Sequence, residues 1–156
     1  MGLLDVFDVS GSAMSAQSVR LNVTASNLAN AQSVSSSVGT TYRARHPVFA
    51  AIAASAISAA GGRTASGFGA TADALDERSA SRGVRVLGII ESQAPPELHY
   101  EPDHPYADAN GYVAYPNVNV VEEMANMISA SRSFQVNVQT MQAAREMATR
   151  LLSLGQ

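Results

Sequence analysis

Two amphipathic segments at the ends of the chain place the strongest constraint on what it can fold into. The first segment has a heptad series of large apolar residues: Phe7, Met14, Leu21 and Leu28. The second series on the same predicted face has mostly small residues: Leu4, Gly11, Ser18 and Ala25. An apolar stripe with this period predicts a helix that packs closely against a partner helix.

The C-terminal segment repeats this pattern over a greater length. Its stripe skips Arg145 and consists of residues spaced by three and four: Val120, Met124, Met127, Ser131, Phe134, Val138, Met141, Ala148 and Leu152. Such spacings lie on one face of a helix. No single partner inside so short a chain would cover both stripes, so the pattern is typical of a subunit that assembles.

Local signals set the ends of the two predicted helices. The first is predicted from Leu3 to Asn30, a residue type that tolerates the left-handed conformation at helix ends. The second begins after Asn119, a good N-cap, with Glu122 three residues later at the capping-box position. It extends to Ser153, which gives a helix roughly 50 Å long.

The residues between the helices predict short extended segments. Residues 42–49 read as extended because Pro47 disfavours the helical region for His46. From Gly83 to Glu91, alternate residues form one mainly apolar face and one mixed face, which favours a strand. Two shorter strands are predicted at 98–101 and 112–115.

Residues 50–82 are dominated by Ala, Ser, Gly and Thr, and they predict a low-complexity loop. The predicted fold class is therefore mainly α with a small β insertion, an α+β fold. The N- and C-terminal helices pair as a coiled coil, with short β-strands between them. Three regions follow: an N-terminal coiled-coil helix at 1–32, a β-containing middle at 33–116 with the insertion 50–83, and a C-terminal coiled-coil helix at 117–156.

Composition excludes several classes of function. The chain has 156 residues and no cysteine, which excludes disulfides and thiolate chemistry. Its net charge is −3, and all of its basic residues are Arg, so nucleic acid is not a predicted partner. The first 19 residues contain Asp5 and Asp8 without Lys or Arg, unlike a cleaved secretory signal. No direct transmembrane segment is predicted, since residues 47–62 are too short and too rich in Ala and Ser.

One segment contains enough metal-ligating residue types to raise a rival hypothesis, a metal or hydrolytic site. These residues are His99, Glu101, Asp103, His104 and Asp108. An EF-hand frame ending at Asn110-Gly111 would put Tyr106 at the position of the first Asp and Asn117 at that of the bidentate Glu, so this motif fails. The sequence also lacks a Gly-x-Ser-x-Gly nucleophile elbow and a phosphate-binding loop. No catalytic residue, metal or cofactor is predicted.

Two motifs resemble a known family. The sequence Ala-Ser-Asn-Leu-Ala-Asn at 25–30 resembles the N-terminal signature of flagellar rod and hook proteins, and residues 122–137 resemble their C-terminal helix. A narrower resemblance to proximal rod proteins rests on five further segments: 86–95, 100–102, 108–113, 115–119 and 154–156. The resemblance covers 1–49 and 84–156, whereas 50–83 matches no part of the family pattern.

The resemblance implies a structural subunit of the bacterial flagellar basal-body rod, which acts by polymerisation and not by catalysis. Such subunits form the drive shaft that transmits torque across the periplasm and surrounds the export channel. They leave the cell through the flagellar type III export apparatus without a cleaved signal. The implied partners are other copies of the chain, other rod proteins, the proteins that join the rod to the MS ring and export gate, and the export apparatus. An export chaperone or another helical binding module is the alternative.

The predicted assembly interface combines the two apolar stripes with two asparagines of the N-terminal motif. Asn27 and Asn30 could equally face solvent or cap the helix. The interface residues are Phe7, Met14, Leu21, Asn27, Leu28, Asn30, Met124, Met127, Phe134, Val138, Met141 and Leu152.

Overall fold

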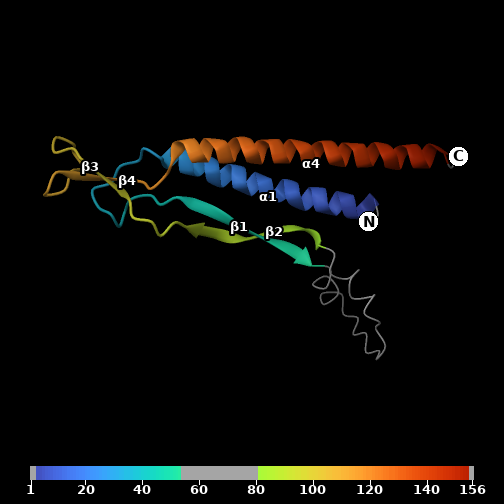
Figure 1. Cartoon of the computed structure of the whole chain (residues 1–156), viewed down its shortest axis with the longest axis horizontal. Helices are drawn as coiled ribbons and strands as arrows, with labels where there is room; N and C mark the ends of the chain where they lie inside the picture. The colour runs from blue at the N-terminus through green and yellow to red at the C-terminus, as the bar shows by residue number, and fades with distance from the viewer. Residues whose placement is uncertain (1–2, 54–80, 155–156) are drawn as a thin grey trace, which may run out of the picture. The chain divides into compact units, whose positions relative to one another are not determined.

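The structure is a computed structural model, and it describes residues 3–53 and 81–154. It has the predicted α+β composition, a long helix at each end with short strands between (Figure 1). The elements in chain order are α1 (Leu3–Asn30), β1 (Arg45–Ala53), β2 (Ser81–Glu91), β3 (Glu97–Tyr100), β4 (Tyr112–Tyr115) and α4 (Val120–Leu154).

Both helices begin and end close to the predicted residues because local hydrogen bonds fix their ends. The Asn119 Oδ1 accepts hydrogen bonds from the backbone N–H groups of Val121 at 3.0 Å and Glu122 at 3.3 Å. This is the geometry of an N-cap, which satisfies donors that the first turn leaves unpaired. In the last turn of α1, the Asn30 Nδ2 donates to the Ser26 carbonyl oxygen at 2.8 Å.

β1 and β2 form a two-stranded sheet and run in opposite directions (Figure 1). The strand predicted from the alternation after Gly83 is confirmed. The predicted loop from Ala50 onward was wrong for its first four residues, because β1 continues to Ala53, and wrong for its last two, because β2 begins at Ser81. Pairing with a distant strand supplies backbone hydrogen bonds that a local reading of small residues misses. The rest of the predicted insertion, 54–80, lies outside the described residues.

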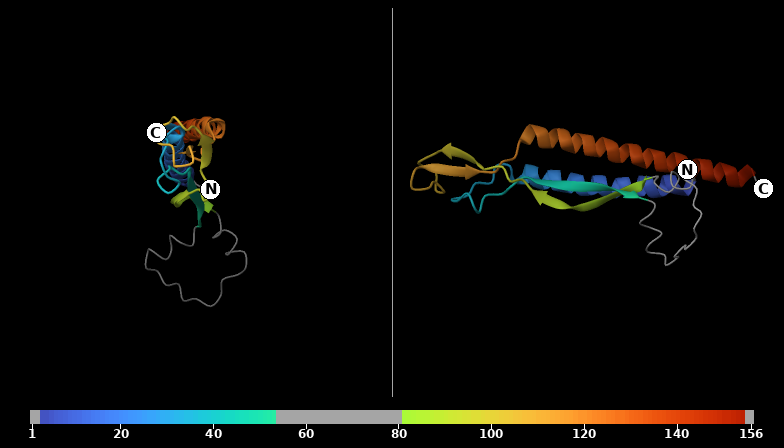
Figure 2. Two further views of the ribbon diagram at one scale, coloured as in Figure 1. Left: turned by 90° about the vertical axis from the view of Figure 1, so that its left-hand side faces the viewer. Right: turned by 60° about the horizontal axis from the view of Figure 1, so that its bottom comes forward.

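β3 and β4 form an antiparallel hairpin (Figure 2). The register pairs Glu97 with Tyr115 and Tyr100 with Tyr112. Gly111 adopts a φ of 80° beside the start of β4, a conformation that favours glycine. A Cβ at this position would lie 2.9 Å from the Tyr100 ring, so the turn is closely packed.

The described residues form two compact units. Unit 1 comprises 3–16, 49–53, 81–86 and 134–154, and unit 2 comprises 17–48 and 87–133. In unit 1 the Ser12 hydroxyl donates to the Val9 carbonyl oxygen at 2.9 Å and accepts from the Val84 N–H at 3.2 Å. Gly83, with a φ of 143°, lies against the Ser12 side chain with no room for a Cβ. Glycine therefore permits the close approach of β2 to α1.

Small and polar side chains make up the interior of the described chain. The buried apolar residues are Ala16, Val23, Ala44, Val113, Ala114, Ala130 and Ala144. The buried polar residues are Ser10, Thr24, Asn27, Thr41 and Glu123. Such an interior contributes little hydrophobic stabilisation per residue, so hydrogen bonds matter more than usual. Neither described helix contains a stretch long and apolar enough to cross a membrane.

Candidate assembly interface

Asn27 is the centre of a buried hydrogen-bond cluster in unit 2. Its side chain is 0% exposed. The Nδ2 donates to the Arg45 carbonyl oxygen at 2.8 Å and to the Glu123 Oε1 at 3.0 Å. The Oδ1 accepts from the Arg45 N–H at 2.9 Å and from the Tyr42 hydroxyl at 2.9 Å. An amide side chain offers two donors and two acceptor sites, so its hydrogen-bonding capacity is filled.

The Asn27 cluster joins α1, the start of β1 and the first turn of α4. Glu123 is only 4% exposed, and a buried carboxylate is costly without a donor. The Asn27 amide supplies that donor. About two turns before Asn27 on α1, the Arg20 guanidinium donates at 2.8 Å to the Oδ1 of Asn126, which lies about one turn after Glu123 on α4. The two hydrogen bonds hold these halves of α1 and α4 side by side within unit 2.

Asn117 makes a second set of hydrogen bonds just before α4. Its Oδ1 accepts from the Ala44 N–H at 2.9 Å, and its Nδ2 donates to the Ala94 carbonyl oxygen at 2.9 Å. The Ser92 N–H donates to the Ala44 carbonyl oxygen at 2.8 Å. Asn117 thus connects the segments that flank β1, β2 and α4.

In each helix, one seven-residue series of the predicted stripe, called the main series, is partly buried within the chain. Phe7, Met14, Leu21 and Leu28 are partly buried, as are Val120, Met127, Phe134, Met141 and Ala148. The accompanying series is different. Five of the residues three positions after the main series are buried, namely Ser10, Thr24, Glu123, Ala130 and Ala144. The predicted stripe continued four positions after the main series, where Met124 and Leu152 are exposed and Val138 is partly buried.

A flank of α4 in unit 2 therefore remains both apolar and exposed. Val121, Met124 and Ile128 are spaced by three and four residues, which puts them on one side of the helix. Their exposed fractions are 76%, 48% and 56%. We call these three residues the α4 flank. Contiguous exposed apolar side chains are typical of protein–protein contact surfaces.

The residues predicted from the sequence for the interface fall into three groups. Asn27 is buried by contacts within the chain, and Asn30 is partly buried with its amide bonded inside α1. Met124 and Leu152 are exposed. The other eight are partly buried: Phe7, Met14, Leu21, Leu28, Met127, Phe134, Val138 and Met141. Their contacts with other subunits stay a prediction.

The sequence reasoning missed the polar partners of Asn27. Tyr42, Arg45 and Glu123 were not singled out, nor was the side chain of Asn117 as a connector. Glu123 lies in the heptad series that proves to be buried, and a charged residue at such a position is a signal for a specific partner. The partner itself lies far away in the sequence and has no local signature.

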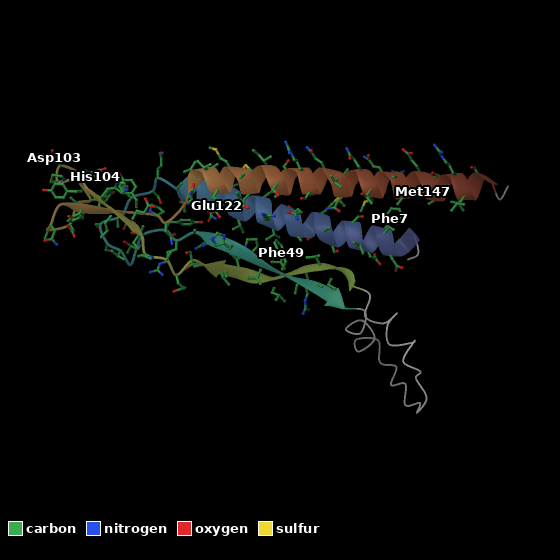
Figure 3. All side chains as sticks on the ribbon, viewed as in Figure 1. Phe7, Phe49, Asp103, His104, Glu122 and Met147 are labelled. Carbon is green, nitrogen blue, oxygen red and sulfur yellow. The ribbon has the colours of Figure 1, made fainter. Side chains whose placement is uncertain are left out.

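Several acidic and histidine residues of the rival metal hypothesis make hydrogen bonds within the β3–β4 hairpin. The Asp108 Oδ1 accepts from the N–H groups of Asn110 at 2.8 Å and Tyr112 at 3.0 Å. The His104 Nδ1 accepts from the Tyr106 N–H at 3.1 Å, and the Tyr115 hydroxyl donates to Glu101 at 3.4 Å. Within 3–53 and 81–154, no three His, Asp or Glu side chains gather as a metal site would require. Figure 3 shows Asp103 and His104 at the turn of the hairpin.

Two of these groups have shifted pKa values. Hydrogen bonds from the Tyr112 and Asn110 N–H groups lower the pKa of Asp108 because they favour the carboxylate, and they outweigh desolvation. Desolvation raises the pKa of Tyr115, and the negative charge of Glu101 and its hydrogen bond add to that rise. Both shifts belong to the local structure of the hairpin.

The comparisons with known proteins agree with this architecture of two terminal helices. The family described as flagella basal body rod protein matches residues 7–34, and the family described as flagellar basal body rod FlgEFG protein C-terminal matches residues 109–154. The matches include the Asn27 motif and the whole of α4. They define the class of the protein, a flagellar basal-body rod protein.

Relatives over the full length narrow the assignment. The chain is 48% identical to flagellar basal-body rod protein FlgC of Salmonella typhimurium, over 100% of both chains. It is 44% identical to FlgC of Yersinia enterocolitica over 100% of both, and 32% identical to FlgC of Borreliella burgdorferi over 99% of this chain and 98% of that protein. The chain belongs to the FlgC family of flagellar basal-body rod proteins. It is a structural subunit of the rod, and these relatives do not favour the chaperone alternative.

Proposed function

We propose that this rod subunit polymerises through the α4 flank and the heptad series of its two helices, and that it forms the proximal part of the drive shaft. In this role it transmits torque across the periplasm and surrounds the export channel. It acts by assembly and not by turnover. The family identifies a rod subunit, and the two surfaces would explain how that subunit polymerises.

The exposure of the α4 flank is the observation that supports polymerisation. Val121, Met124 and Ile128 expose large apolar side chains, while the adjacent buried series is small and polar. Full burial of one such side chain stabilises a contact by about 1.5–3 kcal/mol. Because every copy in a polymer repeats the contact, a modest gain per subunit is enough to favour assembly. A soluble monomer gains nothing from this arrangement.

The partners follow from the chemistry of these surfaces and from the family. The apolar flank and the partly buried Met127, Phe134 and Met141 suit the helices of other copies and of other rod proteins. Methionine adapts its shape to different neighbours, which suits subunits that meet more than one partner. We further propose contacts at the junction with the MS ring and export gate, and delivery by the flagellar type III export apparatus without a cleaved signal.

The test compares two carboxylates introduced one residue apart on α4. Ile128→Asp puts a charge on the α4 flank, and Ser129→Asp puts the same charge on an exposed neighbour as the matched control. We expect Ile128→Asp to abolish swimming and to remove the protein from isolated basal bodies. Ser129→Asp should retain both.

Folding must be separated from assembly in this experiment. Because Ile128 is exposed in the single chain, Ile128→Asp should change the free energy of unfolding of the purified subunit by less than about 0.5 kcal/mol. Rods that form normally with Ile128→Asp would contradict the proposal. Equal loss of swimming with both variants would also contradict it, because the effect would then not depend on the flank.

A further inference from the structure

The β3–β4 hairpin exposes an aromatic face. Tyr100 is 65% exposed, and Leu98, Tyr106 and Tyr112 are also exposed. The rings of Tyr100 and Tyr112 pack edge to face, with centroids 5.4 Å apart and an interplanar angle of 65°. Tyrosine rings in this setting are the residues that protein interfaces use most heavily. The assembly surface proposed above does not include this face.

The hairpin is also acidic. Asp103 and Asp108 lie in its turn, whereas Glu97 and Glu101 alternate with Leu98 and Tyr100 and so lie on the side opposite the aromatic face. The sequence contains no Lys or Arg from Val86 to Ser131. Such a uniform sign of charge selects a basic partner, because opposite charges steer association and like charges oppose it.

The hairpin is held in one conformation before any partner binds. The two strands pair over four residues of each, and the N–H groups of the turn are bonded to the Asp108 carboxylate. A bridge between Ser35 and Ala114 ties β4 to the segment that follows α1. A rigid surface loses little conformational entropy on docking, which favours binding.

The chain itself contains a surface of complementary chemistry. In the C-terminal half of α4, Arg145 and Arg150 are exposed, and Glu146 is the one acidic residue among 134–154, which leaves a net positive charge. So are Met147, Leu151 and Leu152, with exposed fractions of 53%, 60% and 74%. Figure 3 labels Met147 on this part of α4. The helix end has guanidinium groups, which bind aromatic faces and carboxylates, and exposed apolar side chains that a partner would bury.

We propose that the β3–β4 hairpin, with its aromatic face and the exposed Asp103 of its turn, docks on the C-terminal half of α4 of a second copy of this chain. The proposal rests on the function proposed above and adds a specific contact to it. A guanidinium already lies over a tyrosine ring within the chain, at 5.4 Å between Arg45 and Tyr42. Because the two surfaces differ, each copy would offer one of each to its neighbours. Such a heterologous contact repeats from one copy to the next and builds either a ring or an open polymer.

Cysteine cross-linking tests the contact, since the natural chain has no cysteine. The full chain carries Tyr106→Cys and Leu151→Cys together, is expressed in flagellated cells, and is oxidised within isolated basal bodies. We expect disulfide-linked dimers. The control pairs Tyr106→Cys with Gln139→Cys, an exposed position earlier on α4, and should give no dimer.

Charge substitutions then test the chemistry of the contact. Added to the cysteine pair, Asp103→Arg or Arg150→Asp alone should reduce the yield of dimer by about two- to fivefold, as expected for an exposed ion pair. The two together should restore it. An unchanged yield with either single variant would refute the charge complementarity.

The outcomes separate this inference from the proposed function. Basal bodies that contain the Tyr106→Cys, Leu151→Cys protein but give no dimer would overturn the docking and leave the rod subunit in place. Equal dimer yields from the test pair and the control pair would overturn it too. Absence of the unsubstituted chain from isolated rods would instead overturn the proposed function.

Discussion

The buried cluster around Asn27 and the α4 flank lie in the same unit, yet their compositions are the reverse of what a monomeric domain shows. The cluster hides an amide, a carboxylate and a tyrosine hydroxyl, and satisfies them with hydrogen bonds. The flank leaves Val, Met and Ile side chains in contact with solvent. Polar groups fill part of the interior of the single chain, and apolar groups remain exposed on the surface of α4, where the proposed contacts between chains would cover them.

The strongest test of this division is Phe134→Asp, in the main heptad series of α4. Phe134 is partly buried within the chain. We expect rods and swimming to be lost, because removing a well-buried phenylalanine costs about 3–5 kcal/mol and the new charge would be unpaired in the assembly. The free energy of unfolding of the monomer should fall by less than this. Gln139→Glu, on the exposed side, serves as the control and should assemble normally.

The second test removes the polar interior. Asn27→Ala should lower the free energy of unfolding by about 2–4 kcal/mol, because it leaves buried donors and the Glu123 carboxylate without their partner. Asn30→Ala in the same motif loses a single bond to the Ser26 carbonyl oxygen and should cost about 1 kcal/mol. Urea unfolding of both purified variants measures the difference. Equal costs would mean that the cluster does not specify the fold.

These tests also show what the sequence could and could not predict. The helix ends were predictable because Asn119 and Asn30 act on their own neighbours, and the seven-residue period identified the main series. The second buried series of α4 could not be predicted from the sequence. Apolarity favoured Met124, whereas the structure buries Glu123, whose partner lies 96 residues away. The extension of β1 to Ala53 was missed for the same reason, since its partner strand is distant in the chain.

A third test concerns the rigidity of the exposed hairpin. Gly111→Ala should destabilise the hairpin by about 1–2 kcal/mol, because its φ of 80° disfavours a Cβ and the Tyr100 ring would have to move. Amide hydrogen exchange of Tyr100 and Tyr112 should become faster. Gly88→Ala, where a Cβ meets nothing, is the control. Unchanged exchange in Gly111→Ala would show that the turn is not the source of rigidity.

A fourth test weakens α4 at its start and leaves the side chains of the cluster and of the flank unchanged. Asn119→Ala removes the N-cap and should cost about 1 kcal/mol of folding free energy. Asn119→Ser keeps a capping oxygen and should recover most of that loss. Thermal unfolding followed by circular dichroism measures both variants. If the two variants unfold alike, the cap contributes nothing.

The smallest expected effect is the pH dependence of the hairpin. Because hydrogen bonds lower the pKa of Asp108, its contribution to stability is fully present above the unfolded value of 3.8 and is lost as pH falls through the folded value. NMR titration of the Tyr112 amide should therefore show a transition below 3.8 that Asp108→Asn removes. A transition at or above that value would refute the assignment.

The hydrogen bond between Asn27 and Glu123 also bears on the time at which the chain can fold. Its two residues are separated by 96 positions, and the bond closes a loop of that length. Before the first turn of α4 has been synthesised, the Glu123 carboxylate is absent, and water takes its place as a hydrogen-bond acceptor for the Asn27 amide. Loops of this length close slowly compared with local structure. The N-terminal segment of a growing chain thus lacks the carboxylate partner of its central asparagine, and completion of the cluster waits for the last quarter of the sequence to begin.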